Sequence, residues 1–353
     1  MASADLDNLP GLIPPLLLAW YDRSARVLPW RSDPKPYRVW VSEIMLQQTR
    51  VEAVLPYFER FLAALPDVSA LAAADEPKLM KLWQGLGYYS RARNLQKAAR
   101  IIMERHDGRL PADWRALREL PGVGDYTAGA IASIAFGLPE PAVDGNVLRV
   151  LSRVLASGED IALPKVKKRF TALVRAILPQ DRPGDFNQAL MDLGATVCLP
   201  NGAPLCKDCP LAGVCRANAL GIAGTLPVRA AKKPKAIQLK TVFVIRCGGS
   251  TLLALRPPKG LLAGLWELPN ADGWLDGAEA AALLATWGAE PSGLAPLPEA
   301  KHVFTHVEWR MRGFLVDAPC FSPPWQHAWA DGAALHGRYA VPSAFKAYLK
   351  HLP

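Results

Sequence analysis

The feature that most constrains the fold is a change of hydrophobic period near residues 224–240. Before it, apolar residues recur with a helical period and are punctuated by Pro and Gly. After it, apolar and polar residues alternate with the period of two that is typical of strands. The stretch itself, GTLPVRAAKKPKAIQLK, is rich in Pro and Lys, as linkers are. The pattern predicts a helical domain at residues 1–222, a linker at 223–240 and a smaller α+β domain at 241–353.

The two periods also place the individual elements. The helical runs predict helices at Pro14–Ser24, Val39–Leu65, Glu76–Gly85, Ala92–Arg105, Trp114–Leu120, Thr127–Phe136, Val147–Ala156, Lys165–Leu178 and Asp185–Leu193. The alternating runs predict strands at 238–247, 251–257 and 303–317, with helices at 277–288 and 342–352. The first domain is therefore expected to be all-α, and the second to pack helices on a sheet.

Charge and composition narrow the function classes. The 353 residues carry a formal net charge of +9, which favours a polyanionic partner such as nucleic acid, although solubility alone is the other explanation. No window of eighteen apolar residues occurs, so no membrane span is expected. The N-terminal residues lack a basic start followed by an apolar run, so we expect no signal peptide and a cytoplasmic location.

Cysteine spacing predicts a metal centre. Four of the six cysteines fall in the short segment CLPNGAPLCKDCPLAGVC, namely Cys198, Cys206, Cys209 and Cys215. Four thiolates in one compact loop suit an iron–sulfur cluster, while zinc stays open as an alternative. Cys247 and Cys320 lie far apart in apolar or Pro-rich surroundings, and we expect them to be packing residues.

The segment LPGVGDYTAGAIASIAFG predicts a helix–hairpin–helix at about residues 115–136. Gly122 and Gly124 allow a tight turn whose amides, with the start of the next helix, can bind a phosphate. A turn between helices that simply needs glycine is the structural alternative.

Three further segments carry polar residues with two possible roles each. In WVSEIMLQQTR, a step of 100° per residue puts Glu43 opposite the core face, beside the apolar Leu46, where a solvated glutamate is the ordinary outcome. In VDGNVLRVLSRVL, Asp144 or Asn146 is a good N-cap. In GLGYYSRARNL, Tyr88 and its neighbours suit either base stacking or core packing.

Together these segments resemble the endonuclease III superfamily of DNA glycosylases, and within it the adenine DNA glycosylases of the MutY type. The resemblance covers nearly the whole chain. It implies two helical lobes, a [4Fe–4S] cluster on the four cysteines and a Nudix-like C-terminal domain. It also implies a monomeric base excision repair enzyme, associated with the bacterial nucleoid when on DNA, that removes adenine mispaired with 8-oxoguanine or guanine in double-stranded DNA.

The resemblance further implies roles for individual residues. Glu43 would be the general acid at N7 of the flipped adenine, and Asp144 would stabilise the oxocarbenium-like sugar or attack it transiently. Asn146 and Tyr126 would hold the carboxylates and the sugar. Bifunctional relatives carry a lysine at the position of Tyr126, so a monofunctional enzyme is expected.

Other residues are expected to contact DNA. The adenine pocket would contain Trp30, Arg31 and Gln188; the residues beside the duplex would be Leu46, Gln48, Thr49, Tyr88, Gly122 and Gly124; and the reader of 8-oxoguanine would be Phe304, Thr305 and His306. Gln48 and Tyr88 resemble the wedges that fill the gap left by the flipped base.

Three features of the sequence depart from the family pattern. Seven residues separate Cys198 and Cys206, where the family commonly has six, and Thr305 replaces a serine. The C-terminal domain lacks the acidic run of a Nudix hydrolase, so we expect no nucleotide hydrolysis there. The alternatives are a bifunctional endonuclease III-like glycosylase and lyase, a non-catalytic iron–sulfur DNA-binding protein, and a fusion with a nucleotide-cleaning enzyme.

Overall fold

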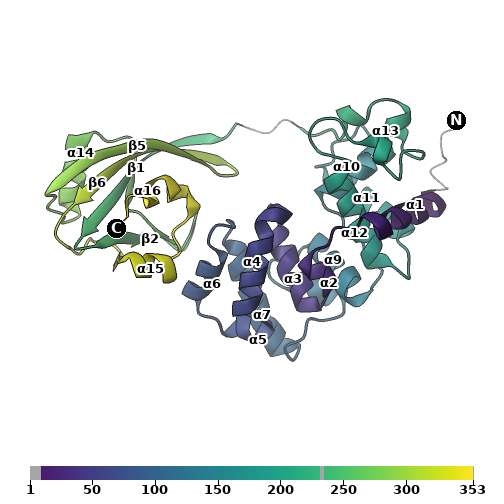
Figure 1. Cartoon of the computed structure of the whole chain (residues 1–353), viewed down its shortest axis with the longest axis horizontal. Coiled ribbons are helices and arrows are strands. Elements are labelled where there is room, and N and C mark those ends of the chain that lie inside the picture. The colour runs from purple at the N-terminus through teal and green to yellow at the C-terminus, as the bar shows by residue number, and fades with distance from the viewer. Residues whose placement is uncertain (1–8, 231–233, 353) are drawn as a thin grey trace. The chain divides into compact units, whose positions relative to one another are not determined.

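The computed structural model describes residues 9–230 and 234–352, and these divide into two compact units (Figure 1). The first unit contains the residues up to Ala73 and those from Asn94 to 230. The second contains residues 74–93 and those from 234 onward. Lys232 and Lys233 of the expected linker lie outside the described residues.

The first unit is helical, as expected. Its helices are α1 (Leu9–Ser24), α2 (Pro29–Ser32), α3 (Pro36–Leu46), α4 (Val51–Ala64), α5 (Val68–Ala73), α7 (Ser90–Arg105, which begins in the second unit), α8 (Trp114–Glu119), α9 (Asp125–Phe136), α10 (Gly145–Val154), α11 (Pro164–Ile177), α12 (Pro183–Thr196) and α13 (Arg216–Ala219), with short 3₁₀ turns at Cys206–Asp208 and Ala223–Thr225. The short helices α2, α5 and α13 were not predicted, because a few residues show no period.

The expected single helix Val39–Leu65 is wrong, because the chain turns between α3 and α4. Gln47 has a ψ of 110°, and Gln48 follows with a φ of +58°, in the left-handed region. The Thr49 amide then donates to the Leu46 carbonyl at 3.2 Å. A residue with a Cβ seldom adopts a positive φ, and this turn contains no glycine or proline, the residues that usually mark a turn. The sequence therefore carries no local signal of the turn.

One apolar core joins four helices of the first unit to the cysteine loop. Leu17 of α1, Leu151 of α10, Phe170 of α11 and Leu190 of α12 are all fully or almost fully buried in it. The same core includes Cys198, which directly follows α12. The packing of α10 against α12 therefore fixes both the start of α10 and the beginning of the loop that contains the four cysteines.

The helix–hairpin–helix is formed by α8 and α9. Asp113 caps α8 by accepting a hydrogen bond from the Ala116 amide at 2.8 Å. Gly122 has a φ of +81°, and a Cβ there would lie 3.0 Å from Cβ of Asn94. The hairpin therefore requires glycine at position 122 for both conformation and space.

The second unit contains a seven-stranded sheet in the order β3–β2–β1–β6–β5, with β4 paired to β1 and β7 to β2. The strands are β1 (Ala236–Cys247), β2 (Ser250–Leu255), β3 (Trp266–Glu267), β4 (Asn270–Asp272), β5 (Gly293–Val303), β6 (Val307–Asp317) and β7 (His327–Ala330). The helices are α6 (Glu76–Trp83), α14 (Gly277–Thr286), α15 (Gly332–Gly337) and α16 (Lys346–Leu349), with a 3₁₀ turn at Ser343–Phe345. Strand β1 runs parallel to β6 and antiparallel to β2 and β4.

Helices cover both faces of this sheet, which confirms the expected α+β class. Val242 and Val244 of β1 belong to one core with residues of α15 and α16, whereas Phe243 and Ile245 belong to a second core with α14. The Glu279 carboxylate accepts from the Asp276 amide at 2.9 Å in a capping box at the start of α14. The single carboxylate of this helix therefore serves the helix terminus.

Two expectations for this unit are wrong. The run 303–317 is not one strand, because β5 and β6 meet in a hairpin whose turn is Phe304–His306, closed by the Phe304 amide on the Val307 carbonyl at 2.8 Å. Cys247 and Cys320 are not free packing residues but form a disulfide, with 5.3 Å between their Cα atoms. The pairing of β1 with β6 brings the two cysteines together across 73 residues, and no local pattern reveals that.

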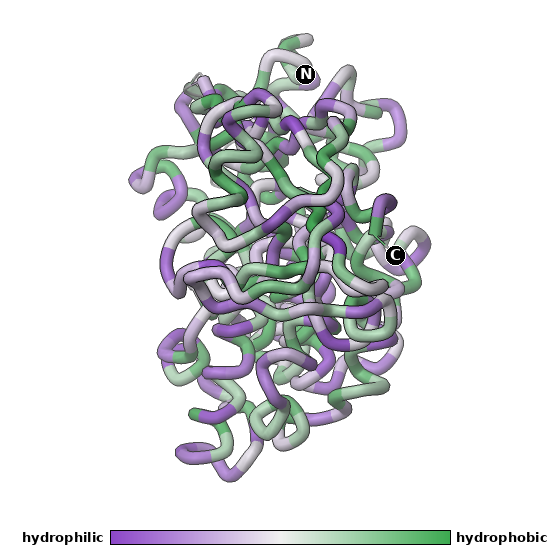
Figure 2. The backbone as a smooth tube through the Cα atoms, turned by 90° about the vertical axis from the view of Figure 1, so that its left-hand side faces the viewer, coloured by the Kyte–Doolittle hydropathy of each residue, from purple (hydrophilic) through white to green (hydrophobic). Residues whose placement is uncertain are grey.

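None of the helices in the described residues is long and apolar enough to cross a membrane. Figure 2 shows why: hydrophobic and hydrophilic residues alternate along the tube in short stretches, as expected for helices and strands that bury one side.

Candidate active site

A pocket of about 450 Å³ in the first unit brings together most of the residues expected at the reaction centre. It is lined by Trp30, Arg31, Glu43, Leu46, Thr49, Tyr126, Asp144, Asn146 and Gln188. These residues come from α2, α3, the turn after α3, α9, the start of α10, and α12. The expected pocket residues thus converge from segments that are far apart in the sequence.

Glu43 is buried in this pocket, with only 5% of its surface exposed. Its Oε2 accepts a hydrogen bond from the Tyr126 hydroxyl at 2.7 Å. Burial, reinforced by the negative charge of Asp144, raises the pKa of Glu43 to about 7, although the Tyr126 hydrogen bond and the Arg31 charge act in the opposite direction. A solvated surface position, the ordinary outcome for this glutamate, is therefore wrong. The carboxyl group can hold a proton near neutral pH.

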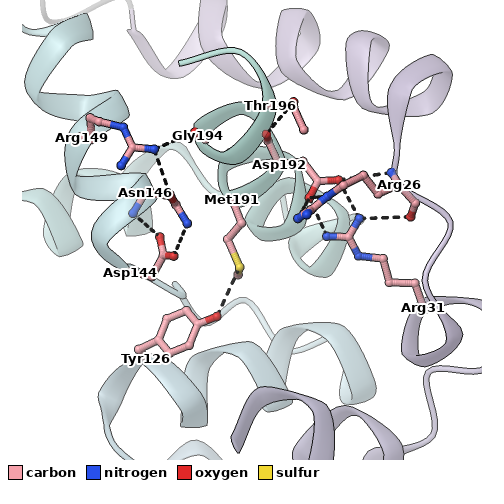
Figure 3. A network of polar contacts seen from close by, with 10 residues as sticks. All are labelled: Arg26, Arg31, Tyr126, Asp144, Asn146, Arg149, Met191, Asp192, Gly194 and Thr196. Atoms are coloured by element: carbon pink, nitrogen blue, oxygen red, sulfur yellow. Dashed lines mark hydrogen bonds and ion pairs between the residues drawn. The ribbon is translucent and has the colours of Figure 1, made fainter. Parts of the chain in front are cut away.

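Tyr126 lies in the first turn of α9, where its hydroxyl also lies 3.4 Å from Sδ of Met191 (Figure 3). Burial and the neighbouring carboxylates raise its pKa well above the usual value. The hydroxyl therefore stays neutral and donates its hydrogen to the shorter contact, the Glu43 carboxyl.

Asp144 is the N-cap of α10, and the same side chain lines the pocket. Its Oδ1 accepts from the amides of Asn146 and Val147, both at 2.8 Å, and its Oδ2 accepts from Asn146 Nδ2 at 2.7 Å. Burial raises the pKa of Asp144, and these hydrogen bonds oppose the rise. The capping role is therefore confirmed, and it does not exclude a chemical one.

A buried arginine, which the sequence analysis did not single out, supports Asn146 (Figure 3). Nη2 of Arg149 donates to Oδ1 of Asn146 at 2.9 Å and to the Gly194 carbonyl at 2.6 Å, while Nε donates to the Cys198 carbonyl at 2.8 Å. A Cβ at Gly194 would lie 2.6 Å from Cβ of Asn146, so glycine is required for this approach of α12 to α10. Arg149 follows Asn146 by three residues on a helix, and that spacing could have identified it.

Two arginines that line the pocket are paired with a buried aspartate behind them. Arg26, Arg31 and Asp192 are joined by short hydrogen bonds, and Figure 3 shows both guanidinium groups directed at the Asp192 carboxylate. Arg26 and Asp192 were not predicted. Asp192 follows Gln188 by four residues on α12, so the two share a helix face, which is the signal that could have found it.

The four cysteines of the loop surround a common cavity in the first unit. All four are free thiols. Arg153 Nη1 lies 3.1 Å from Sγ of Cys198, and the Cys215 thiol lies 3.5 Å from the Arg153 carbonyl. Within the described residues, no three His, Cys, Asp or Glu side chains converge closely enough to hold one ion. The thiols therefore border a cavity and do not meet at a point.

The remaining expected DNA contacts lie outside the pocket. Gln48 is exposed in the turn after α3. In the second unit, the Tyr88 hydroxyl lies 2.6 Å from Oγ1 of Thr305, and Tyr88 has a φ of +48°. Thr305 and His306 are exposed, whereas Phe304 is half-buried with its ring 4.9 Å from that of Trp309. Phe304 therefore packs on the sheet core.

Mutation of the arginine behind Asn146 tests the connection from α12 to the pocket. Arg149→Gln is expected to lower the activity of this pocket roughly 10- to 100-fold, because Asn146 and Asp144 lose the support that fixes their positions. The unpaired Gly194 and Cys198 carbonyls should also lower the free energy of unfolding by about 1–3 kcal/mol. Single-turnover kinetics and thermal unfolding measure the two effects. Arg175→Gln, which removes an exposed ion pair with Glu140, is the matched control.

Comparisons with known proteins agree with this geometry. Residues 41–176 match the HhH-GPD superfamily of base excision DNA repair proteins, and residues 241–351 match the NUDIX domain. The chain is 37% identical to the adenine DNA glycosylase of Mus musculus over an alignment of 372 positions, which covers 87% of this chain and 72% of that protein. It is 39% identical to the adenine DNA glycosylase of Rattus norvegicus over an alignment of 350 positions, which covers 83% of this chain and 68% of that protein.

Solved structures show the same helical fold. A thermostable thymine-DNA glycosylase superposes with a TM-score of 0.57 at 26% identity, covering 62% of this chain and all of the other. Endonuclease III in a non-covalent complex with DNA gives a TM-score of 0.51 at 23% identity, covering 60% and 98%. With the helical region, the NUDIX region and relatives that match along most of the chain, the protein belongs to the adenine DNA glycosylases of the helix–hairpin–helix superfamily.

Proposed function

We propose that this chain hydrolyses the N-glycosidic bond of adenine mispaired with 8-oxoguanine or guanine in duplex DNA. The observation that carries the proposal is the burial of Glu43 and Asp144 in one pocket, with the pKa of Glu43 raised to about 7. Two carboxyl groups on a reacting sugar, one of them able to hold a proton, are what glycoside hydrolysis needs.

The proposed reaction divides the work between the two carboxyl groups. Adenine is a poor leaving group until it is protonated, and Glu43 donates its proton to N7 of the flipped base. Asp144 stabilises the positive charge that develops at C1′, or attacks it transiently. Asn146 fixes Asp144 through the hydrogen bond from its Nδ2, and Tyr126 fixes Glu43. Water completes the hydrolysis and leaves free adenine and an abasic sugar.

Side chains of the pocket wall suit a flipped base. Trp30 is only 5% exposed and packs edge-on against Phe58, with ring centroids 5.1 Å apart, so its position is rigid. Gln188 supplies an amide that can pair with a base edge, and Leu46 supplies an apolar surface. The amides of the Gly122–Gly124 turn and the start of α9 are proposed to bind a DNA phosphate.

An excision assay tests the whole proposal. The chain is incubated with a duplex that contains adenine opposite 8-oxoguanine, and strand breaks are then measured with and without alkali. Breaks only after alkali are the expected result, because Tyr126 offers no amine to form a Schiff base with the sugar. A strong adduct after borohydride trapping would support the bifunctional alternative, and binding without excision would support a non-catalytic protein.

The cysteine cavity is proposed to hold an iron–sulfur cluster. Four free thiols from one compact loop border one cavity, a ligand set that suits such a cluster, with zinc as the alternative. Cys198, Cys206, Cys209 and Cys215 would hold a [4Fe–4S] cluster, which when bound would cross-link the loop 198–215. The Arg153 guanidinium beside Cys198 Sγ suits a negatively charged thiolate.

The metal content of the purified protein checks this assignment. Protein prepared without oxygen is expected to be brown and to contain about four iron atoms per chain. Colourless protein loaded with zinc under the same conditions would refute the cluster.

The turn Phe304–His306 is proposed to read the base opposite adenine. 8-Oxoguanine differs from guanine by an oxygen at C8 and a hydrogen on N7. The exposed Thr305 hydroxyl, 2.6 Å from the Tyr88 hydroxyl, can accept a hydrogen bond from that N7–H. Phe304 anchors the turn on the sheet core, while Thr305 and His306 stay exposed.

Loss of the Thr305 hydroxyl should weaken discrimination and leave the chemistry intact. Thr305→Ala is expected to reduce the preference for adenine opposite 8-oxoguanine over adenine opposite guanine by about 1–3 kcal/mol, the worth of a hydrogen bond to the lesion. The ratio of the two single-turnover efficiencies measures it. Thr286→Ala, an exposed threonine at the end of α14, is the control. An undiminished preference would remove any reading role from Thr305.

A further inference from the structure

One carboxylate behind the pocket accepts hydrogen bonds from two arginines at once. Oδ1 of Asp192 accepts from Arg26 Nε at 2.8 Å, from Arg26 Nη2 at 2.5 Å and from Arg31 Nη2 at 2.8 Å. Its Oδ2 accepts from Arg31 Nη1 at 2.6 Å. The Asp192 side chain is 1% exposed. Figure 3 shows both guanidinium groups directed at it, that of Arg26 from the segment after α1 and that of Arg31 from α2.

The arginines face the pocket, whereas Asp192 stands behind them. Arg26 and Arg31 line the pocket together with Glu43, and Asp192 is not part of the lining. Burial acts to raise the pKa of Asp192, but the hydrogen bonds and charges of Arg31 and Arg26 hold it below its usual value. The triad of Arg26, Arg31 and Asp192 is therefore fully ionised and carries one net positive charge beside Glu43, the proposed acid.

We propose that Asp192 is a positioning residue for adenine excision: it fixes Arg26 and Arg31 on the pocket wall that they share with Glu43. This inference rests on the proposed function. The charge of Arg31 already acts on Glu43 in the direction of ionisation. Without Asp192, two partly buried cations would lose their shared partner, and the charge of Arg31 would act on the Glu43 carboxyl without that compensation.

The structural alternative is that the triad only stabilises the fold. A buried ion pair is weak evidence for stability, because taking charges out of water costs about as much as their attraction returns. The position of the triad favours a role in the pocket.

The other charged or titratable groups around Glu43 are Tyr126 of α9, Asp144 at the start of α10, and Arg50 and Glu52 at the start of α4. The α12 residues that line the pocket, Gln188, Met191, Ala195 and Thr196, are uncharged.

The pH dependence of single-turnover excision separates the two roles. Glu43 must be protonated, so the rate falls as the pH rises through its pKa. Asp192→Asn removes a negative charge, which lowers the pKa of Glu43, so the fall should move to lower pH. The rate at neutral pH should drop roughly 10- to 100-fold because Arg31 also loses its fixed position. Asp192→Glu, which keeps the charge, should restore the position of the fall.

A second variant, Arg26→Gln, should shift the pH profile in the opposite direction. It keeps the inference testable if Asp192→Asn does not fold. Arg26→Gln removes a positive charge and leaves Asp192 paired with Arg31, so the fall in rate should move to higher pH. Asp185→Asn, on the same helix but in an exposed pair with Arg182, should leave the profile unchanged. Each variant is first checked by thermal unfolding and by its affinity for an uncleavable duplex.

Clear outcomes overturn the inference. An Asp192→Asn protein that is slower but keeps the wild-type pH profile would reduce Asp192 to a structural residue. If that variant does not fold, an unchanged profile or a downward shift in Arg26→Gln would equally leave Asp192 with a structural role alone. If the proposed function itself is wrong, the wild-type chain will not release adenine, and this result is distinguishable from an unchanged pH profile in a variant.

Discussion

Replacement of Glu43 by glutamine is expected to abolish adenine excision and to leave mismatch binding largely intact. Glutamine has nearly the shape of glutamate, and its amide can still accept the hydrogen bond from Tyr126. It cannot donate a proton as an acid, so the rate should fall by at least roughly 10²–10⁴-fold. Single-turnover excision and a binding titration on the same duplex measure the two properties.

The pH profile provides an independent check of the same role. In the wild-type chain, the rate should fall as the pH rises through about 7, because burial raises the pKa of Glu43 to that value and activity needs the protonated form. Glu59→Gln, the same substitution on the exposed face of α4, should leave rate and profile unchanged. A Glu43→Gln protein with the wild-type rate would show that another group supplies the proton.

Glu43 also illustrates how far hydrophobic period predicts burial. The pattern of α3 placed Val41, Ile44 and Met45 correctly in the core, but it placed Glu43 on the opposite, solvated face. That face is covered, since α3 is buried from Val39 to Met45 and α9 packs against it. A period shows that a helix has two faces and does not show that a second element covers the polar one.

Some features of the site can be predicted from local sequence patterns, whereas others depend on contacts between residues far apart in the chain. Local spacing identified the N-cap Asp144, the Gly122 turn and the four clustered cysteines. Arg26 and Asp192 are 166 positions apart in the chain, and Arg149 and the Cys198 carbonyl 49, so only the packing of distant helices reveals those contacts. The Cys247–Cys320 disulfide was missed for the same reason, because the register of β1 against β6 creates it.

Asp144→Asn is expected to lower the excision rate roughly 10²–10³-fold, because the pocket loses the negative charge that stabilises the cationic sugar. Asparagine caps a helix about as well as aspartate does, so its oxygen can keep the hydrogen bonds from the amides of Asn146 and Val147. Its amide would then face Nδ2 of Asn146, donor against donor. The loss of that single hydrogen bond should cost about 1 kcal/mol of unfolding free energy.

A second cap separates the chemical role of Asp144 from the structural one. Asp276 caps α14 with the same geometry, accepting from the amides of Ala278 and Glu279 at 2.9 Å, and it lies in the other unit. Asp276→Asn should therefore leave excision unchanged. The Asp144→Asn profile should also fall at lower pH than the wild type, since the charge of Asp144 helps to raise the pKa of Glu43. Equal rates for the two variants would leave Asp144 as a helix cap, and the cation would then need another partner in the pocket.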